Sequence, residues 1–252
     1  MSAIKDIEGI SFARGGDAAL WQIPTRKTPT TVDWGDEEGL DVDLSRPLFE
    51  PVEGRVSLVL RPSLLSLLRS AIRQPSLSLL SLERTVVVRP RAVEELRHLP
   101  GGDYLCAELS FAVDDPMALW DALPTDCTPY RHGAPLLLGD QPLSTIGFAV
   151  GDCLDTMRRP RIIKRQRTEE SAFRAMRQVY YAREPKSRLE VIQLPLALPR
   201  LEVGPLASLW QLIRQPGPTT LGGVRGYVSR VDGPSVGPTG VARFTLFFTP
   251  ID

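Results

Sequence analysis

Apolar and polar residues alternate with a period of two in two segments of the chain. In YLCAELSF (residues 104–111) every second residue is apolar, and VARFTLFF (residues 241–248) repeats the pattern apart from Phe247 on the other face. Successive side chains of a strand point to opposite faces, so this period predicts two strands that each bury one face. The predicted inward residues are Leu105, Ala107, Leu109 and Phe111 in the first strand and Ala242, Phe244, Leu246 and Phe248 in the second.

Two other segments follow the helical period. Apolar residues recur there at i, i+3 and i+7, the spacing of one helical face, and this predicts two short helices that pack on sheets. A proline follows each segment, and its ring ends the helix because it cannot continue the hydrogen-bond ladder. The residues are Leu65, Leu68, Ile72 and Pro75 in the first segment and Leu206, Leu209, Ile213 and Pro216 in the second.

The tetrapeptide IRQP stands at residues 72–75 and again at 213–216. The same offset along the chain places Leu80 on Leu221, Val87 on Val228 and Arg89 on Arg230. Other blocks match in the same order: ISFARGG (10–16) with IGFAVGD (146–152), residues 55–58 with 188–191, and the two alternating segments with each other. Similar blocks in one order predict an internal duplication.

The matches predict two homologous domains, residues 1–115 and 144–252, joined by a proline-rich linker at residues 116–143 in which residues 117–123 form one helical turn. Each domain has an opening strand, an irregular arm, a strand, a short helix and two further strands. The proline-rich residues 195–205 are expected to be a loop insertion, and the pairs Gly101-Gly102 and Gly222-Gly223 to be hairpin turns. This order predicts an α+β class, mainly β, with a sandwich or barrel and one flanking helix per domain.

Composition adds limits to this picture. The 252 residues are 42% hydrophobic and 24% charged, as in an ordinary globular protein, and 30 basic side chains balance 30 acidic ones. Three cysteines, Cys106, Cys127 and Cys153, are too few for a disulfide framework, which favours a reducing compartment. The first residues contain no apolar signal segment, and no run has the length of a membrane span.

Patterns for catalysis are scarce. The chain contains no GxxxxGK[ST], GxGxxG or HExxH motif, and His98 and His132 are its two histidines. His132 lies near Cys127 without the second pair that a zinc site needs, and Cys153 has no nearby base, so neither a metal, a cofactor nor a catalytic residue is predicted. A hydrolase or transferase therefore has almost no support.

Two charged runs lie in the arms of the two domains. Residues 33–43 carry six acids and no base, and residues 158–167 carry six bases and no acid. The simplest interpretation is two solvated loops. A second is nucleic-acid binding by the basic run, because clustered arginines neutralise phosphates, although no aromatic residue is interleaved with it.

The third interpretation is assembly, in which an arm of one subunit docks on its neighbour and charge complementarity sets the register. The candidate interface residues are Asp36, Glu37, Glu38, Asp41, Arg158, Arg159, Arg161, Lys164, Arg165 and Arg167. The part of the basic arm that begins at Thr168 is expected to be a helix, with Phe173, Met176 and Tyr180 at helical spacing.

The blocks together resemble the two-domain tail proteins of phages and prophages, of the distal-tail or baseplate-ring kind. The resemblance lies in DWGDEEGLDVDLSRPLFEPVEGRVSLVL (residues 33–60), with its DW, G-x-D-V-D-L-S and P-x-F elements, then the helix ending in QP and the strand closing at LSFAVDDP. It covers nearly the whole chain. The second half repeats the plan without the DW and VDLS elements.

The resemblance implies tail-tube-like β-sandwich domains and a non-enzymatic, structural subunit of a tail or baseplate ring, distal-tail or hub-like, between tube and tip. It implies a homo-oligomeric ring of hexamer-type symmetry that contacts tube, tape-measure and hub proteins, with DNA only in transit and no membrane. The expected location is the virion tail, assembled in the bacterial cytoplasm. The alternative from another class is nucleic-acid binding by residues 158–167.

Overall fold

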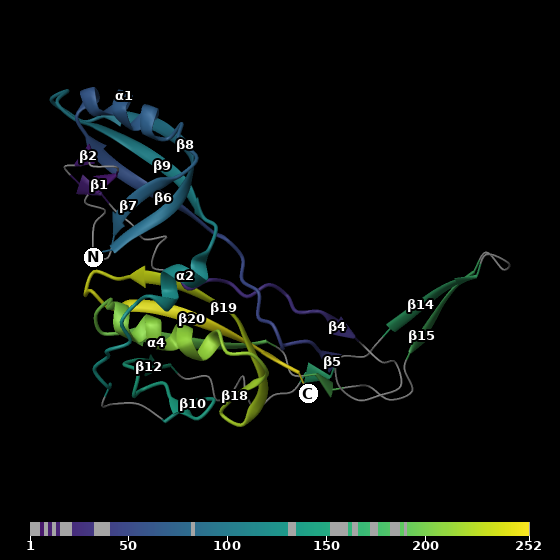
Figure 1. Cartoon of the computed structure of the whole chain (residues 1–252). Coiled ribbons are helices and arrows are strands. Elements are labelled where there is room, and N and C mark those ends of the chain that lie inside the picture. Colours follow the sequence, from purple (N-terminus) through teal and green to yellow (C-terminus); the bar gives the residue numbers. More distant parts are fainter. Residues whose placement is uncertain are drawn as a thin grey trace.

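Two antiparallel sheets, one in each half of the chain, form the body of the protein (Figure 1). The structure is a computed structural model. It describes residues 6–7, 10–11, 14–15, 22–32, 41–81, 84–130, 135–151, 161–162, 166–171, 176–181, 187–188 and 191–251.

The first sheet has seven strands in the order β2-β1-β7-β8-β9-β6-β3, and helix α1 connects β6 to β7. Its elements are β1 (Asp6–Ile7), β2 (Ile10–Ser11), β3 (Arg14–Gly15), β6 (Val52–Leu60), α1 (Pro62–Ala71), β7 (Leu77–Ser81), β8 (Arg84–His98) and β9 (Leu105–Val113).

The second sheet has the order β11-β10-β18-β19-β20-β17-β12, which repeats the first sheet position by position. Its elements are β10 (Leu137–Leu138), β11 (Gln141–Pro142), β12 (Ala149–Val150), β17 (Ile192–Leu198), α4 (Val203–Ile213), β18 (Thr219–Leu221), β19 (Val224–Val236) and β20 (Ala242–Pro250). The mainly β class is confirmed, and two sheets of one topology agree with an internal duplication.

Neither sheet closes into a barrel in the part of the chain that the structure describes, because each order ends in strands of two residues that pair on one side. Each domain therefore contains one open sheet with a helix against it. Residues 116–143 hold more than a connection: they form helix α2 (Pro116–Asp121) and also β10 and β11, which belong to the second sheet.

The strand registers define the duplication more closely. Leu60 pairs with Leu105, and Leu198 pairs with Ala242, so Leu60 and Leu198 occupy equivalent positions. The sequence match of residues 55–58 with 188–191 is therefore wrong. Residues 195–198 are part of β17 and not a loop, because Ile192, Leu194, Leu196 and Leu198 alternate inward and this period outweighs Pro195.

The long strands β8 and β19 correspond at the offset that relates Leu60 to Leu198, since Pro90 pairs with Phe111 and Val228 pairs with Phe248. Both carry a bulge directly afterwards, at Arg91 and at Ser229. The sequence matches of Val87 with Val228 and Arg89 with Arg230 are thus out of register. The cause is the preceding hairpin, which is longer in the first domain, where β7 and β8 pair as far as Ser81 and Arg84.

Both predicted hairpin turns are confirmed. Gly222 and Gly223 form the two-residue turn between β18 and β19, and Gly101 and Gly102 lie between β8 and β9. All four have positive φ, which glycine adopts at little cost.

Each helix packs on one face of its sheet. Leu65 and Leu68 of α1 are buried with the inward residues of β6 and β9, and Leu206, Leu209 and Ile213 of α4 are buried with those of β17 and β20. Ile72 is half-buried against the first core. The helical faces predicted from the leucine spacing are confirmed.

The helix α1 offers a matched pair of neighbours for testing this packing. Leu68 is fully buried, whereas Leu67 is 54% exposed. Leu68→Ala is expected to lower the free energy of unfolding by about 2–5 kcal/mol through the cavity it leaves. Leu67→Ala should change it by about 0.5 kcal/mol or less. Urea unfolding followed by circular dichroism measures both, and equal effects would contradict the assigned face.

Candidate assembly surfaces

An arm leaves each sheet between equivalent strands, and the two arms are antiparallel ladders of the same register. In the first arm Arg26 bridges Phe49, and β4 (Thr31–Val32) pairs with β5 (Asp41–Val42). In the second, β13 (Arg161–Ile162) pairs with β16 (Ser187–Arg188), and β14 (Gln166–Ser171) pairs with β15 (Met176–Tyr181).

Equivalent residues of the two arms differ by one fixed number of residues in the outgoing strand and by another in the returning strand. The Arg26–Phe49 bridge becomes Ile162–Ser187, and the pair Thr31–Val42 becomes Arg167–Tyr180; both second-arm pairs are present. The returning strand has the same offset as the sheets. The similarity of the two halves therefore extends to the arms.

The helix predicted from Thr168 onward is wrong, because β14 and β15 form a hairpin. Apolar residues spaced three and four apart fit a helix, but β-branched and aromatic residues such as Val179, Tyr180 and Tyr181 favour strands. Long-range equivalence to β4 and β5, which the sequence comparison did not detect in the arms, would have decided between the two.

The structure describes three of the ten candidate interface residues. Asp41 lies in β5, Arg161 in β13 and Arg167 in β14. Asp36, Glu37, Glu38, Arg158, Arg159, Lys164 and Arg165 lie outside the described residues.

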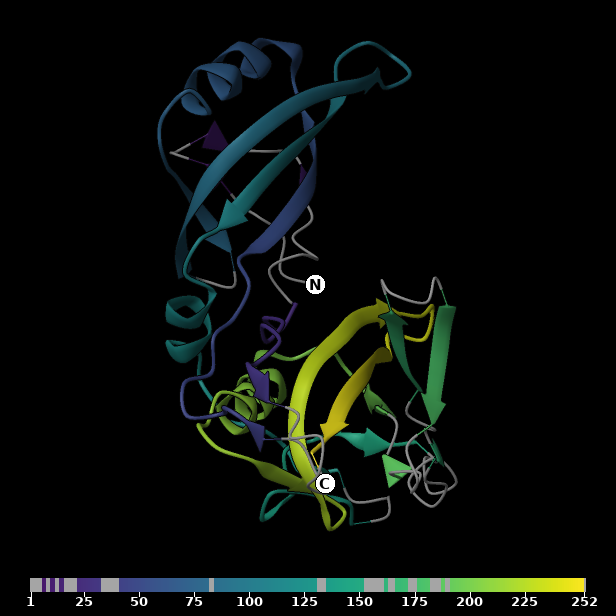
Figure 2. The same ribbon diagram turned by 90° about the vertical axis from the view of Figure 1, so that its right-hand side faces the viewer.

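The base of the first arm packs on the second domain of the same chain, as Figure 2 shows by the purple segment beside α4. Ile23 is buried in the second core, and Phe49 stacks edge-to-face on Trp210 of α4 with ring centroids 4.7 Å apart. Leu44 is buried, and its carbonyl accepts a hydrogen bond from the Gly217 amide at 2.8 Å. Burial of these apolar side chains holds the arm against its neighbouring domain.

Arg26 fixes the arm along β19. Its backbone N–H donates to the Ser229 carbonyl at 2.9 Å, and its guanidinium lies 5.3 Å from the centre of the Tyr227 ring, a cation–π contact. The side chain is 6% exposed, and Nη2 has no hydrogen-bond partner. Burial lowers the pKa of Arg26 below its ordinary value, and the Tyr227 phenol partly opposes this shift. Arginine remains charged in spite of such a shift, so the aromatic face carries the compensation.

The D-V-D-L-S element at residues 41–45 forms a turn. The Asp43 carboxylate accepts hydrogen bonds from the Ser45 amide at 3.0 Å and from the Ser45 hydroxyl at 2.6 Å, and these bonds lower the pKa of Asp43. The turn presents Leu44 to the second domain, so this element of the phage-tail resemblance has a structural role within the chain.

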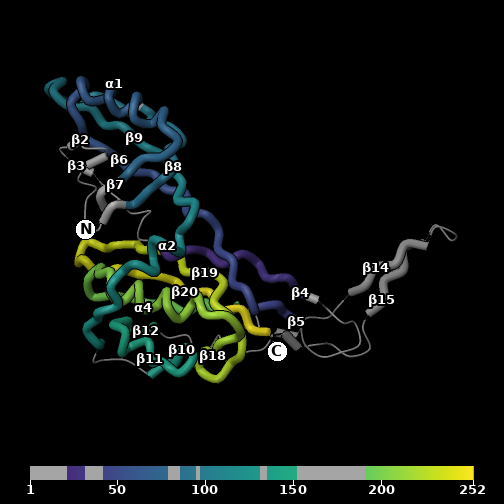
Figure 3. Tube along the Cα trace, viewed as in Figure 1, coloured from purple at the N-terminus to yellow at the C-terminus, as the bar shows by residue number. Residues whose placement is uncertain are grey.

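Helix α2 forms a second link between the domains (Figure 3). Leu119 packs against both cores, and Trp120 is buried in the second. The Asp121 carboxylate accepts a hydrogen bond from Trp210 Nε1 at 2.7 Å and pairs with Arg214 at 2.6 Å. Gly204 lies so close to the Asp126 backbone that a Cβ there would overlap it, which explains a glycine inside α4.

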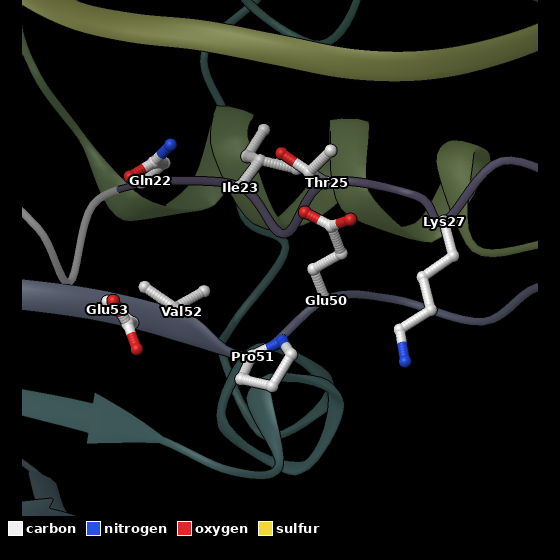
Figure 4. A pocket seen from close by; sticks show the side chains of 8 residues that line it. All are labelled: Gln22, Ile23, Thr25, Lys27, Glu50, Pro51, Val52 and Glu53. Carbon is white, nitrogen blue, oxygen red and sulfur yellow. The ribbon is translucent and has the colours of Figure 1, made fainter.

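A pocket of about 460 Å³ lies where the first arm joins β6 (Figure 4). It is lined by Gln22, Ile23, Thr25, Lys27, Glu50, Pro51, Val52 and Glu53. Glu50 points toward Thr25, while Lys27 and Glu53 point away from it. The eight residues include no nucleophile paired with a base, and we assign the pocket no reaction.

Other candidates from the sequence are dispersed. Cys106 and Cys127 are unbridged and half-buried, His98 is exposed, and His132 and Cys153 lie outside the described residues. The described part of the chain holds no cluster of three metal-ligating side chains.

Sequence reasoning missed the residues that join the first arm and α2 to the second domain, above all Arg26, Trp210 and Asp121. A signal was present for Trp210, because residues 203–213 contain no charged residue and are apolar on more than one face. Such a helix is covered on both sides. No signal marked Arg26 or Asp121, whose partners are distant in the sequence.

No model of a known protein family matches the chain, and a search of curated proteins also finds no match. Among the described residues, no helix is long and apolar enough to cross a membrane.

The stacking of Phe49 on Trp210 can be tested beside an exposed neighbour. Phe49→Ala is expected to destabilise the arm by about 2–4 kcal/mol, because it removes the contact of a partly buried ring with the buried Trp210, and so to speed cleavage of residues 22–50 by trypsin. Leu48→Ala, at a position that is 64% exposed, is the control and should leave the cleavage rate unchanged. Equal protection of the Phe49→Ala arm would contradict the docking.

The Asp121 carboxylate gives a second test. Asp121→Ala leaves the buried Trp210 N–H without its acceptor, which is expected to lower the free energy of unfolding by about 1–3 kcal/mol and to change tryptophan fluorescence. Asp114→Ala removes a pair with Arg89 whose side chains are 56% and 51% exposed, so it should cost less than about 1 kcal/mol. A larger effect at Asp114 would overturn this ranking.

Proposed function

We propose that this protein is a structural, non-enzymatic ring subunit of a phage-like tail or baseplate, of the distal-tail or hub-like kind that joins the tube to the tip. The observation that carries the proposal is that the arm of one domain leaves its own sheet and packs on the next related domain. Repeated units that each pass an arm to the next are suited to assemblies of rotational symmetry.

The rest of the architecture supports a mechanical role. The described residues form two cores and the contacts that join them, and the D-V-D-L-S and P-x-F elements place Leu44 and Phe49 on the neighbouring domain. Homo-oligomerisation, tail partners and a location in the virion are parts of this proposal.

Nucleic-acid binding by the basic arm is a second candidate, and one observation favours it. The hairpin pairs Arg167 with Tyr180 and Gln166 with Tyr181, which brings aromatic residues opposite the end of the basic run. Single-stranded nucleic acids bind to such combinations of charge and stacking.

Assembly can be tested on the purified full chain. We expect sedimentation velocity across a concentration series to show association, and negative-stain images to show closed rings with an open lumen. Reversing Arg161, Lys164 and Arg165 to glutamate should weaken association roughly tenfold, since each exposed ion pair contributes about 0.2–1 kcal/mol.

Reversing the exposed Arg73, Arg200 and Arg243 to glutamate controls for the change in net charge and should leave association intact. A strict monomer at every concentration would contradict the ring. DNA affinity that falls steeply with salt, and is lost in the triple reversal alone, would favour the second candidate.

A further inference from the structure

The docking of the first arm completes a strand edge. In the second sheet, β18 pairs with β19 as far as Gly226, and β19 continues to Val236. Beyond β18 the Arg26 N–H donates to the carbonyl of Ser229, the bulge residue. The arm thus supplies a backbone hydrogen bond to this edge beyond the end of β18.

The amide of Arg26 points to β19 because of its place in the arm ladder. The flanking hydrogen bonds, from Lys27 N to the Leu48 carbonyl and from Glu50 N to the Thr25 carbonyl, make Arg26–Phe49 a pair that exchanges no backbone hydrogen bonds. In such a pair the amide faces away from the partner strand.

The first sheet has an equivalent edge. There β7 pairs with β8 as far as Val88, and β8 continues to His98 through the bulge at Arg91, the counterpart of Ser229. Within the described residues, no backbone amide from outside the sheet donates to the Arg91 carbonyl. Arg89, the counterpart of the buried Tyr227, is exposed, as is Arg91. Within the described residues, the edge that the first arm contacts in the second domain has no such contact in the first.

The second arm carries the equivalent donor. Ile162 of β13 corresponds to Arg26, and its pair with Ser187 corresponds to Arg26–Phe49. By this correspondence we infer that the Ile162 amide has the same direction, away from β16.

We propose that β13 of one copy docks on the β8 edge of a second copy, with the Ile162 N–H donating to the Arg91 carbonyl. This rests on the proposed ring function and names the contact that closes the ring. In this scheme the donor lies on the second arm and the acceptor on the first domain, so the contact between copies is head-to-tail. Figure 1 places β14 and β15, the continuation of this arm, away from the first sheet of the same chain.

Backbone pairing explains how the contact tolerates different side chains at the two sites. Addition of a strand to an open edge uses main-chain hydrogen bonds, which do not depend on residue type. The arginines at the β8 edge have their own counter-charges, since Arg89 pairs with Asp114 at 2.7 Å and Arg91 with Glu53 at 3.1 Å. A basic arm therefore meets neutralised guanidinium groups.

Cysteine cross-linking tests the contact on the full chain, with Cys106, Cys127 and Cys153 replaced by serine. One variant carries Ile162→Cys and another carries Arg91→Cys. We expect a disulfide-linked dimer when the two are mixed under oxidation, and no dimer when either is oxidised alone. The matched control is the pair Arg26→Cys and Ser229→Cys in one chain, which should close a disulfide within the monomer and form no dimer.

The proposal would be overturned if no mixed dimer formed while the control disulfide did. It would also be overturned by a monomeric disulfide when Ile162→Cys and Arg91→Cys are combined in one chain, because the arm would then lie on its own first domain. A third contrary outcome is absence of association in the unmodified protein. Rings in negative-stain images without the mixed dimer would leave the proposed function standing and remove this contact alone.

Ile162→Pro, which deletes the donor, should abolish association, whereas Ser187→Pro, whose amide faces the other side of the arm, should retain it.

Discussion

A strand that extends beyond its neighbour leaves backbone groups to which another segment can bond, and in the second domain the first arm uses this edge. The central strand β19 has 13 residues, whereas its neighbour β18 has three. Because unpaired backbone groups at an edge are costly when buried and hazardous when exposed, the remaining length needs a cover. The first arm supplies it at Ser229, and the packing of Ile23, Leu44 and Phe49 follows from where the arm must lie.

The same constraint accounts for the difference between the two equivalent helices. Helix α4 buries residues on more than one face, including Trp210, because α2 and the first arm cover the side turned away from the sheet. Helix α1 buries Leu65 and Leu68 and leaves Leu67 exposed. The number of apolar faces on each helix therefore matches the number of sides on which other elements pack.

Much of the fold could be predicted from local patterns, since inward leucines, alternating strands and turn glycines reflect contacts close in sequence or period. Registers could not, because a longer hairpin in the first domain shifts the match of Arg89 from Tyr227 to Arg230 without altering either pattern. The loop predicted at Pro195 was wrong because a proline disrupts a strand only where the missing amide would have bonded to a neighbouring strand. The contacts of Arg26 and Asp121 join residues that lie far apart along the chain, and one sequence holds no trace of such pairs.

The covalent connection between the domains has a kinetic and thermodynamic consequence for the arm. A segment tethered beside its binding face experiences an effective concentration in the millimolar range, so a contact of modest intrinsic strength is occupied nearly all the time. The same contact between separate molecules would be governed by the concentration of the protein in solution. Because both domains belong to one chain, docking of the first arm on the second domain is thus independent of how much protein is present.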